Sequence, residues 1–132
     1  MMNDEVTNIL LIEDTVGDAV LVKEMIQRTT DFKINLLVAD NLARGLKYIA
    51  AENLHAILLD LNLPDSRGLK TFQQVHKFSM NTPVVIMSIL TDKELIYQAM
   101  KEGAQDYLIK NQLEKEAFVR CIRYAIWSRH AA

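Results

Sequence analysis

The stretch Ala56-Ile57-Leu58-Leu59-Asp60 decides the fold, because four apolar residues run without interruption into a single carboxylate. Continuous apolarity of this length is typical of a strand that is buried on both faces of a parallel sheet. Four similar apolar runs lie along the chain, at residues 9–12, 36–38, 84–87 and 107–109. The sequence therefore predicts five strands in one parallel sheet.

The segments between these runs carry a helical pattern, with apolar residues three or four positions apart, as at Leu69, Phe72 and Val75. Strict alternation of strands and helices favours right-handed crossovers, which place helices on both faces of the sheet. We therefore predict a doubly wound α/β fold as one domain over residues 1–132, with a fifth helix over about residues 113–129.

The composition fits a globular domain: of 132 residues, 50% are hydrophobic and 24% are charged. A net charge of -2 gives no electrostatic reason to expect a nucleic-acid partner. The single cysteine excludes a disulfide within the chain and a cysteine-based zinc site. Residues 1–5 lack the basic region of a secretory signal, and no apolar run reaches the ~20 residues of a membrane span. We expect a cytoplasmic protein without a membrane partner.

Polar residues follow four of the five apolar runs. Glu13 and Asp14 follow the first, Asp60 the third, Ser88 the fourth and Lys110 the fifth. Ligands of a doubly wound sheet bind beyond the carboxyl ends of its strands, so these five side chains are expected to converge. Each alone has an ordinary explanation as a helix cap or a solvated charge, but together they predict a site. Residues 39–41, after the second run, resemble a helix N-cap instead.

The predicted site favours Mg²⁺ and phosphoryl transfer. Clustered carboxylates repel one another unless a cation offsets them, and Lys110 supplies only one positive charge. All the candidate ligands are oxygens, which suits Mg²⁺, and no histidine lies near these strand ends. A carboxylate that faces Mg²⁺, a lysine and a hydroxyl can attack a phosphoryl group in line, and Asp60 is the natural nucleophile.

These residues stand in four motifs, and together they resemble the receiver domain of two-component response regulators along the whole chain. The motifs are ILLIEDTVGDA (residues 9–19), ILLDLNLPDSRGL (57–69), PVVIMS (83–88) and GAQDYLIK (103–110). The resemblance implies a flavodoxin-like fold with strand order 2-1-3-4-5. It also implies that Asp60 is the phosphoacceptor and a metal ligand, that Asp14 binds Mg²⁺ directly and Glu13 through water, and that Asn62 contributes its backbone carbonyl.

The same resemblance assigns roles in signalling. It implies that Ser88 and Lys110 contact the phosphoryl group and that Tyr107 is an aromatic switch. Two positions depart from the family pattern. Ile89 stands where the family usually has Ala or Gly, and we expect it to restrict access to the pocket. Asn111 follows the lysine where many receivers have a proline in a cis bond, so the sequence does not determine the geometry of the Lys110–Asn111 peptide.

The partners implied are a sensor histidine kinase or a histidine phosphotransfer protein. Phosphorylation would switch the surface of the fourth helix, fifth strand and fifth helix, through which the chain could form a homodimer. An output domain could follow the fifth helix. We expect a phosphoprotein that transfers and slowly loses its own phosphate, not a turnover enzyme. The alternative is a receiver-like interaction module that is never phosphorylated. A phosphatase is a weaker reading, because position 62 is Asn where a general acid is needed.

Overall fold

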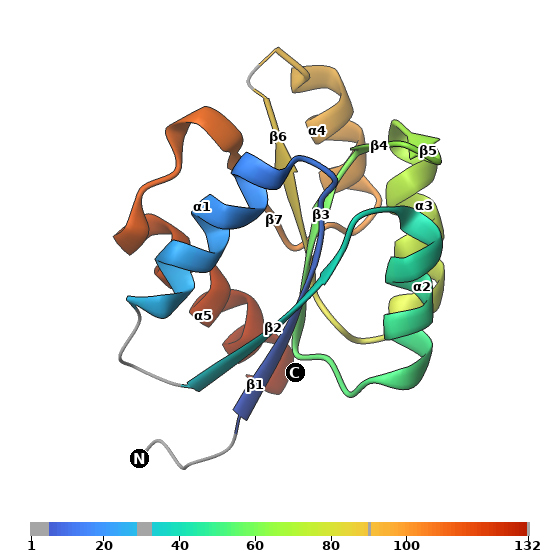
Figure 1. Ribbon diagram of the computed structural model, residues 1–132. Helices are drawn as coiled ribbons and strands as arrows, with labels where there is room; N and C mark the ends of the chain where they lie inside the picture. The colour runs from blue at the N-terminus through green and yellow to red at the C-terminus, as the bar shows by residue number, and fades with distance from the viewer. Residues whose placement is uncertain (1–5, 29–32, 90, 132) are drawn as a thin grey trace.

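The central feature of the computed structural model, which describes residues 6–28, 33–89 and 91–131, is a five-stranded parallel sheet (Figure 1). Its strands are β1 (Val6–Ile12), β2 (Lys33–Ala39), β3 (Ala56–Asp60), β6 (Val84–Ser88) and β7 (Asp106–Ile109). They lie in the order β2-β1-β3-β6-β7, and every neighbouring pair is parallel. Because β6 and β7 are the fourth and fifth strands of this sheet, the predicted order 2-1-3-4-5 is confirmed.

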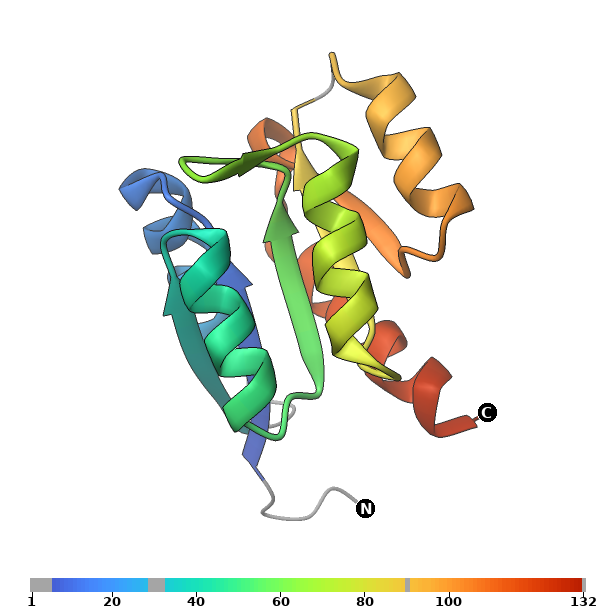
Figure 2. The same ribbon diagram turned by 90° about the vertical axis from the view of Figure 1, so that its right-hand side faces the viewer.

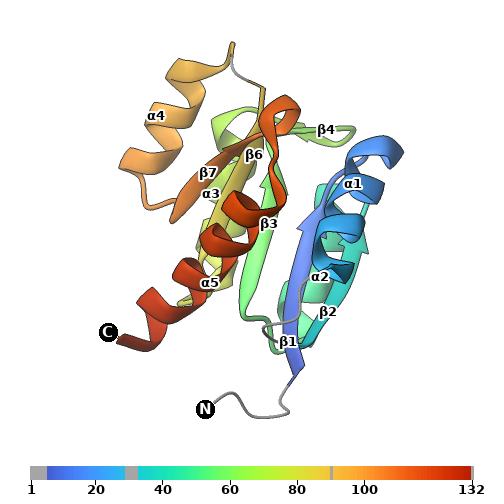
Figure 3. The same cartoon turned by 90° about the vertical axis from the view of Figure 1, so that its left-hand side faces the viewer.

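Helices cover both faces of the sheet, as predicted. Within the described ranges, α1 (Val16–Gln27) and α5 (Lys115–Ala131) lie on one face, seen in front in Figure 3. The other face carries α2 (Leu42–Ala51), α3 (Leu69–Ser79) and α4 (Lys93–Lys101), seen from their own side in Figure 2. None of the helices in the described part of the chain combines the length and apolarity that crossing a membrane requires.

The sheet separates two apolar cores, and successive strand residues contribute to them alternately. In β1, Leu10 and Ile12 pack with α2, α3 and α4, whereas Ile9 and Leu11 pack with α1 and α5. All four side chains are fully buried, and burying each contributes ~1.5–3 kcal/mol relative to leaving it exposed. Because apolar side chains occupy both faces of the strands, the polar side chains of neighbouring strands can lie together only where the strands end.

A short antiparallel pair follows Asp60, and the sequence pattern does not predict it. It consists of β4 (Asn62–Leu63) and β5 (Ser66–Arg67). The buried Ser66 hydroxyl is hydrogen-bonded to the Thr71 hydroxyl at 2.7 Å, which ties this pair to α3. The loop after the predicted nucleophile is therefore a defined element that begins two residues after Asp60.

The tip of this hairpin caps the start of α2. The Asp65 carboxylate accepts hydrogen bonds from the backbone N–H groups of Leu42 at 2.8 Å and Ala43 at 3.0 Å. Asn41 accepts from the N–H of Arg44 at 2.8 Å, so the predicted N-cap at residues 39–41 is confirmed at Asn41. Slight burial raises the pKa of Asp65, but the backbone donors outweigh it and hold that pKa below its ordinary value.

The fifth helix begins later than predicted. Leu113 has φ −70° and ψ 129°, an extended conformation, so the helix starts at Lys115 instead of residue 113. Lys110, Asn111 and Gln112 form a separate 3₁₀ turn. No peptide bond is cis anywhere in the described residues, so the Lys110–Asn111 bond is trans. Lys110 is the first residue of this turn and directly follows β7 at the edge of the sheet.

Candidate functional site

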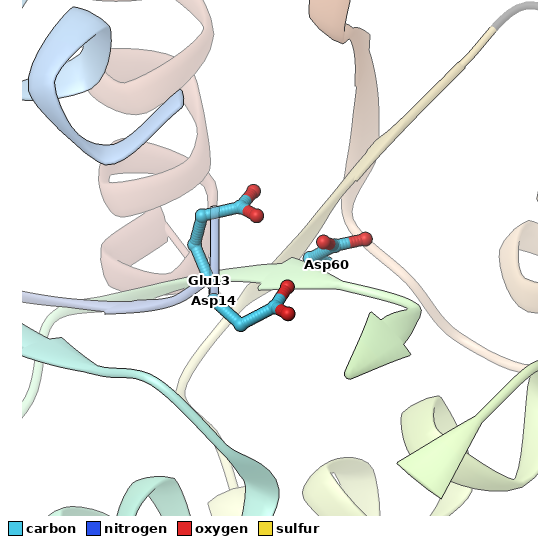
Figure 4. Close-up of side chains that lie close together, drawn as sticks. All are labelled: Glu13, Asp14 and Asp60. Carbon is cyan, nitrogen blue, oxygen red and sulfur yellow. The ribbon is translucent and has the colours of Figure 1, made fainter. Parts of the chain in front are cut away.

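Three carboxyl groups meet where β1 and β3 end (Figure 4). Glu13 and Asp14 follow β1, and Asp60 is the last residue of β3. The two strands are hydrogen-bonded neighbours with Ile12 opposite Leu59, so the residues that come next are adjacent. One oxygen from each of the three carboxyl groups lies within 4.8 Å of the other two. We call Glu13, Asp14 and Asp60 the acid cluster.

The Lys110 ammonium group is the cation that faces this cluster. Its Nζ atom donates a hydrogen bond to Asp60 Oδ2 at 3.0 Å and lies 2.9 Å from Glu13 Oε1. It also lies 3.1 Å from Asp18 Oδ2 on α1. Burial lowers the pKa of Lys110, but the carboxylates of Glu13, Asp60 and Asp18 outweigh it and raise that pKa overall. The lysine is therefore charged at every physiological pH.

Glu13 is the most deeply buried acid of the cluster, with 2% of its surface exposed. Its Oε2 atom accepts a hydrogen bond from the N–H of Thr15 at 3.1 Å. Burial raises the pKa of Glu13 to about 7, Lys110 lowers it and the Asp60 carboxylate raises it further. Its Oε1 atom lies near the Lys110 charge but accepts no aligned hydrogen bond from any described residue. The Lys110 charge offsets part of the cost of burying this oxygen, and a bound cation or an ordered water would satisfy it further.

The acid cluster fits Mg²⁺. Every candidate ligand is a carboxylate oxygen, Glu13 has a buried oxygen without an aligned hydrogen bond from the described residues, and the Asp14 side chain is exposed at the edge of the sheet. Mg²⁺ in proteins is held by one or two carboxylates and keeps its other octahedral positions for water and phosphate oxygens. Glu13, Asp14 and Asp60 are therefore the side chains that would hold the ion, some of them directly and the others through bound water.

Both oxygens of Asp60 are oriented by neighbours. Its Oδ1 atom accepts a hydrogen bond from the N–H of Asn62 at 3.0 Å, and its Oδ2 atom accepts from Lys110. The contact of Asn62 seen here is through its N–H. Its predicted role as a metal ligand through the carbonyl stays a prediction. The Asp60 carboxylate is thus held at the end of the central strand by one backbone donor and one ammonium group.

Among the described residues, Asp60 makes hydrogen bonds to Asn62 and Lys110 but none to the remaining predicted residues Ser88, Ile89 and Tyr107. The buried Ser88 hydroxyl donates to Asp92 Oδ2 at 3.4 Å, so it is directed toward the start of α4. Ile89 follows Ser88, and 50% of its surface is exposed. Tyr107 lies on β7 with 45% of its surface exposed. The structure thus brings Glu13, Asp14, Asp60 and Lys110 together, whereas the roles of Ser88, Ile89 and Tyr107 stay predictions.

Two acids of this region, Asp18 and Asp92, are missed by reasoning from the sequence. Asp18 is the third residue of α1, and Asp92 is the residue that precedes α4. An acid at either position is usually explained by the helix dipole or by capping. Yet Asp92 makes no side-chain capping bond, and its carboxylate accepts from Ser88 instead. For Asp18 the available signal was its place in the first helical turn after Glu13 and Asp14.

A family model described as the response regulator receiver domain matches residues 9–122. The chain is 31% identical over 125 residues to the nitrate/nitrite response regulator protein NarL of Escherichia coli strain K12, covering 95% of this chain and 57% of that protein. It is 32% identical over 118 residues to the transcriptional regulatory protein KdpE of Staphylococcus aureus, covering 88% of this chain and 49% of that protein. The chain therefore spans about half the length of these curated relatives.

Solved structures share the fold. The signal receiver domain of an HD domain-containing protein from Pseudomonas fluorescens Pf-5 superposes with a TM-score of 0.83 at 17% identity, covering 99% of this chain and 93% of that one. A CheY-like response regulator receiver domain protein from Methanospirillum hungatei JF-1 superposes with a TM-score of 0.82 at 18% identity, covering 96% of this chain and 98% of that one. At these identities the likeness shows the fold alone.

Proposed function

The chain belongs to the response regulator receiver domain family of two-component signalling, and we propose that its Asp60 accepts a phosphoryl group. The observation that carries the proposal is the setting of Asp60, whose carboxylate lies in the acid cluster and accepts a hydrogen bond from Lys110 at 3.0 Å. The donor would be a phosphohistidine of a sensor histidine kinase or of a histidine phosphotransfer protein. Such a donor places the reaction in the cytoplasm.

The proposed reaction is an in-line displacement at phosphorus. An Asp60 oxygen forms the new P–O bond while the P–N bond to the donor histidine breaks, and the imidazole leaves. Because Asp60 attacks as a carboxylate, no proton has to be removed from the nucleophile. Lys110, 3.0 Å from Asp60 Oδ2, neutralises charge that develops on the phosphoryl oxygens. Glu13, Asp14, Asp60 and the Asn62 carbonyl would hold Mg²⁺, and the ion would supply further positive charge to the same phosphoryl oxygens.

The phosphorylated state would be read by Ser88 and Tyr107. Ser88 would exchange its 3.4 Å bond to Asp92 for one to a phosphoryl oxygen. Tyr107 would turn inward from its exposed position on β7. The proposed mechanism is a shift between two states that alters the surface of α4, β7 and α5.

That surface, which we call the α4–β7–α5 face, has exposed aromatic residues and an open pocket that suit an interface. Tyr97 on α4, Tyr107 on β7 and Tyr124 on α5 are all exposed. Beside α5 lies an open pocket of about 420 Å³ lined by Asp106, Leu108, Ala117, Arg120, Cys121 and Tyr124. Exposed aromatic side chains are typical of protein interfaces. We propose that this face forms a homodimer or contacts an output domain after α5.

Phosphorylation can be tested by incubating the protein with Mg²⁺ and a small phosphodonor and measuring its intact mass. The expected result is a mass increase of one phosphoryl group that is stable in acid and lost in alkali, as an acyl phosphate is. Beryllofluoride, a phosphoryl mimic, serves as a parallel probe in case Ile89 obstructs the donor. If neither an adduct nor beryllofluoride binding is found, the chain is better explained as an interaction module that is never phosphorylated.

Ile89 is expected to slow the loss of phosphate. It follows Ser88 with half of its surface exposed, a position from which its side chain can hinder water that approaches the phosphoryl group. In this proposal the lone chain hydrolyses its own acyl phosphate slowly and is not a turnover enzyme. Replacing Ile89 by Ala should shorten the lifetime of the adduct several-fold, measured by intact mass over time. An equal or longer lifetime in Ile89→Ala would contradict this role.

Mg²⁺ binding is expected to depend on pH through Glu13, whose pKa is raised to about 7, first of all by burial. A protonated Glu13 cannot serve as a ligand, and with this pKa the ionised fraction rises from about a tenth at pH 6 to about nine tenths at pH 8. The affinity for Mg²⁺ should therefore be higher at pH 8 than at pH 6, by at most about tenfold because Asp14 and Asp60 remain as ligands. Isothermal titration calorimetry can measure both values. The Glu13→Gln variant should lose this dependence, and a flat profile in the wild type would refute the argument.

A further inference from the structure

The contact between Asp18 and Lys110 links α1 to the candidate site from outside the acid cluster. Asp18 Oδ2 lies 3.1 Å from Lys110 Nζ, and 31% of the Asp18 side chain is exposed. The other two carboxylates around this ammonium group, those of Glu13 and Asp60, belong to the cluster. Asp18 is thus the acid near Lys110 that is not among the candidate metal ligands.

Asp18 is not the only residue that holds Lys110 in place. Only 13% of its side chain is exposed, and its Nζ atom is already fixed by the bond to Asp60 at 3.0 Å and the contact with Glu13 at 2.9 Å. What Asp18 adds is a further negative charge beside the Lys110 ammonium group, the one that faces Asp60 among the residues that the structure describes. A carboxylate in that place competes with any anion that needs Lys110, because like charges repel strongly where burial limits screening.

Building on the proposed function, we propose that Asp18 is a positioning residue that restrains Lys110 in the unphosphorylated state and competes with the phosphoryl group for it. A phosphoryl group on Asp60 replaces one carboxylate charge by a larger charge spread over three oxygens. Lys110 must then serve these oxygens and Asp18 at once. Phosphorylation of Asp60 therefore weakens the ion pair of Asp18 and Lys110, which joins α1 to the turn Lys110–Gln112.

The coupling acts in both directions. If phosphorylation weakens the contact between Asp18 and Lys110, then whatever draws Asp18 away from Lys110 must favour phosphorylation to the same extent. Asp18 is in the first turn of α1, beside the exposed Val16 and Val20. A partner that docks on this turn could therefore change the affinity of the site for a phosphoryl group without touching Asp60.

The test compares the binding of beryllofluoride with Mg²⁺ to the wild type and to Asp18→Asn by isothermal titration calorimetry. The Asn side chain keeps the shape of Asp18 and removes its charge, so beryllofluoride should bind about fivefold more tightly. The affinity for Mg²⁺ alone should stay equal or fall, since a negative charge near the metal has been removed. The matched control is Glu24→Gln, which removes an exposed charge from the same helix and should leave both affinities unchanged.

The outcomes separate the two proposals. If the wild type fails to bind beryllofluoride, the proposed function fails and takes this inference with it. If the wild type binds but Asp18→Asn binds equally or more weakly, only the role of Asp18 is overturned. If Asp18 only stabilises the helix N-terminus, Asp18→Asn should lower the melting temperature measured without Mg²⁺ and leave beryllofluoride binding unchanged.

Discussion

Replacing Asp60 by Asn is expected to abolish the phosphoryl adduct while leaving the fold intact. An amide oxygen is not a nucleophile of comparable strength, so no acyl phosphate forms. The Asn side chain has nearly the same shape, and its oxygen can still accept the hydrogen bond from the N–H of Asn62. One of the three carboxylates of the acid cluster is lost, and the affinity for Mg²⁺ should fall at least about tenfold. Intact mass and calorimetry measure the two effects.

The matched control for this experiment is Asp40→Asn. Asp40 directly follows β2, on the same edge of the sheet, but its carboxylate contacts Asn41 and Arg44 on the surface. This variant should be phosphorylated and should bind Mg²⁺ like the wild type. An adduct that persists in Asp60→Asn would place the phosphoryl group elsewhere and would refute Asp60 as the acceptor.

Of the substitutions proposed for this protein, Lys110→Met is expected to lower the free energy of unfolding the most. The substitution removes the ammonium group that lies within 3.1 Å of Glu13, Asp18 and Asp60, two of which are buried. Removing one partner of a buried ion pair leaves an uncompensated charge and costs about 3–5 kcal/mol. Chemical denaturation without Mg²⁺ measures this cost. Saturating Mg²⁺ should restore part of the loss, because it supplies the missing positive charge.

The loss in Lys110→Met should also grow with pH. Lys110 lowers the pKa of Glu13, so without it that pKa lies above the value of about 7 found with the lysine present. A carboxyl group whose folded pKa exceeds its unfolded value destabilises the fold as the pH rises between the two values. The deficit should therefore be larger at pH 8 than at pH 5. The control Lys115→Met removes an exposed lysine of α5 and should cost little at either pH.

Much of the fold is predictable because its signals are local. Continuous apolar runs such as residues 56–59 identify buried parallel strands, and the switch to a helical period identifies what lies between them. The hairpin β4–β5 is not predicted, because each of its strands has two residues and its place depends on Asp65 reaching α2. The start of α5 is also misplaced, since nothing in the sequence around Leu113 indicates an extended residue there.

The acid cluster is predictable from topology alone, since the carboxyl ends of neighbouring parallel strands share one edge. Asp18 and Asp92 are not, because their roles depend on where a helical side chain points across space. Ser88 illustrates the same limit. Its position at the end of β6 follows from the pattern, but the direction of its hydroxyl toward Asp92 does not.

Trapping the adduct shows which residue carries the phosphoryl group. Borohydride reduces an acyl phosphate to an alcohol and leaves free carboxylates unchanged. The protein is incubated with Mg²⁺ and a small phosphodonor, reduced, digested and sequenced by mass spectrometry. We predict conversion of residue 60 to homoserine only when Mg²⁺ and the donor are both present. Conversion at another acid, such as Asp14 or Glu13, with residue 60 unchanged, would show that Asp60 is not the phosphoacceptor.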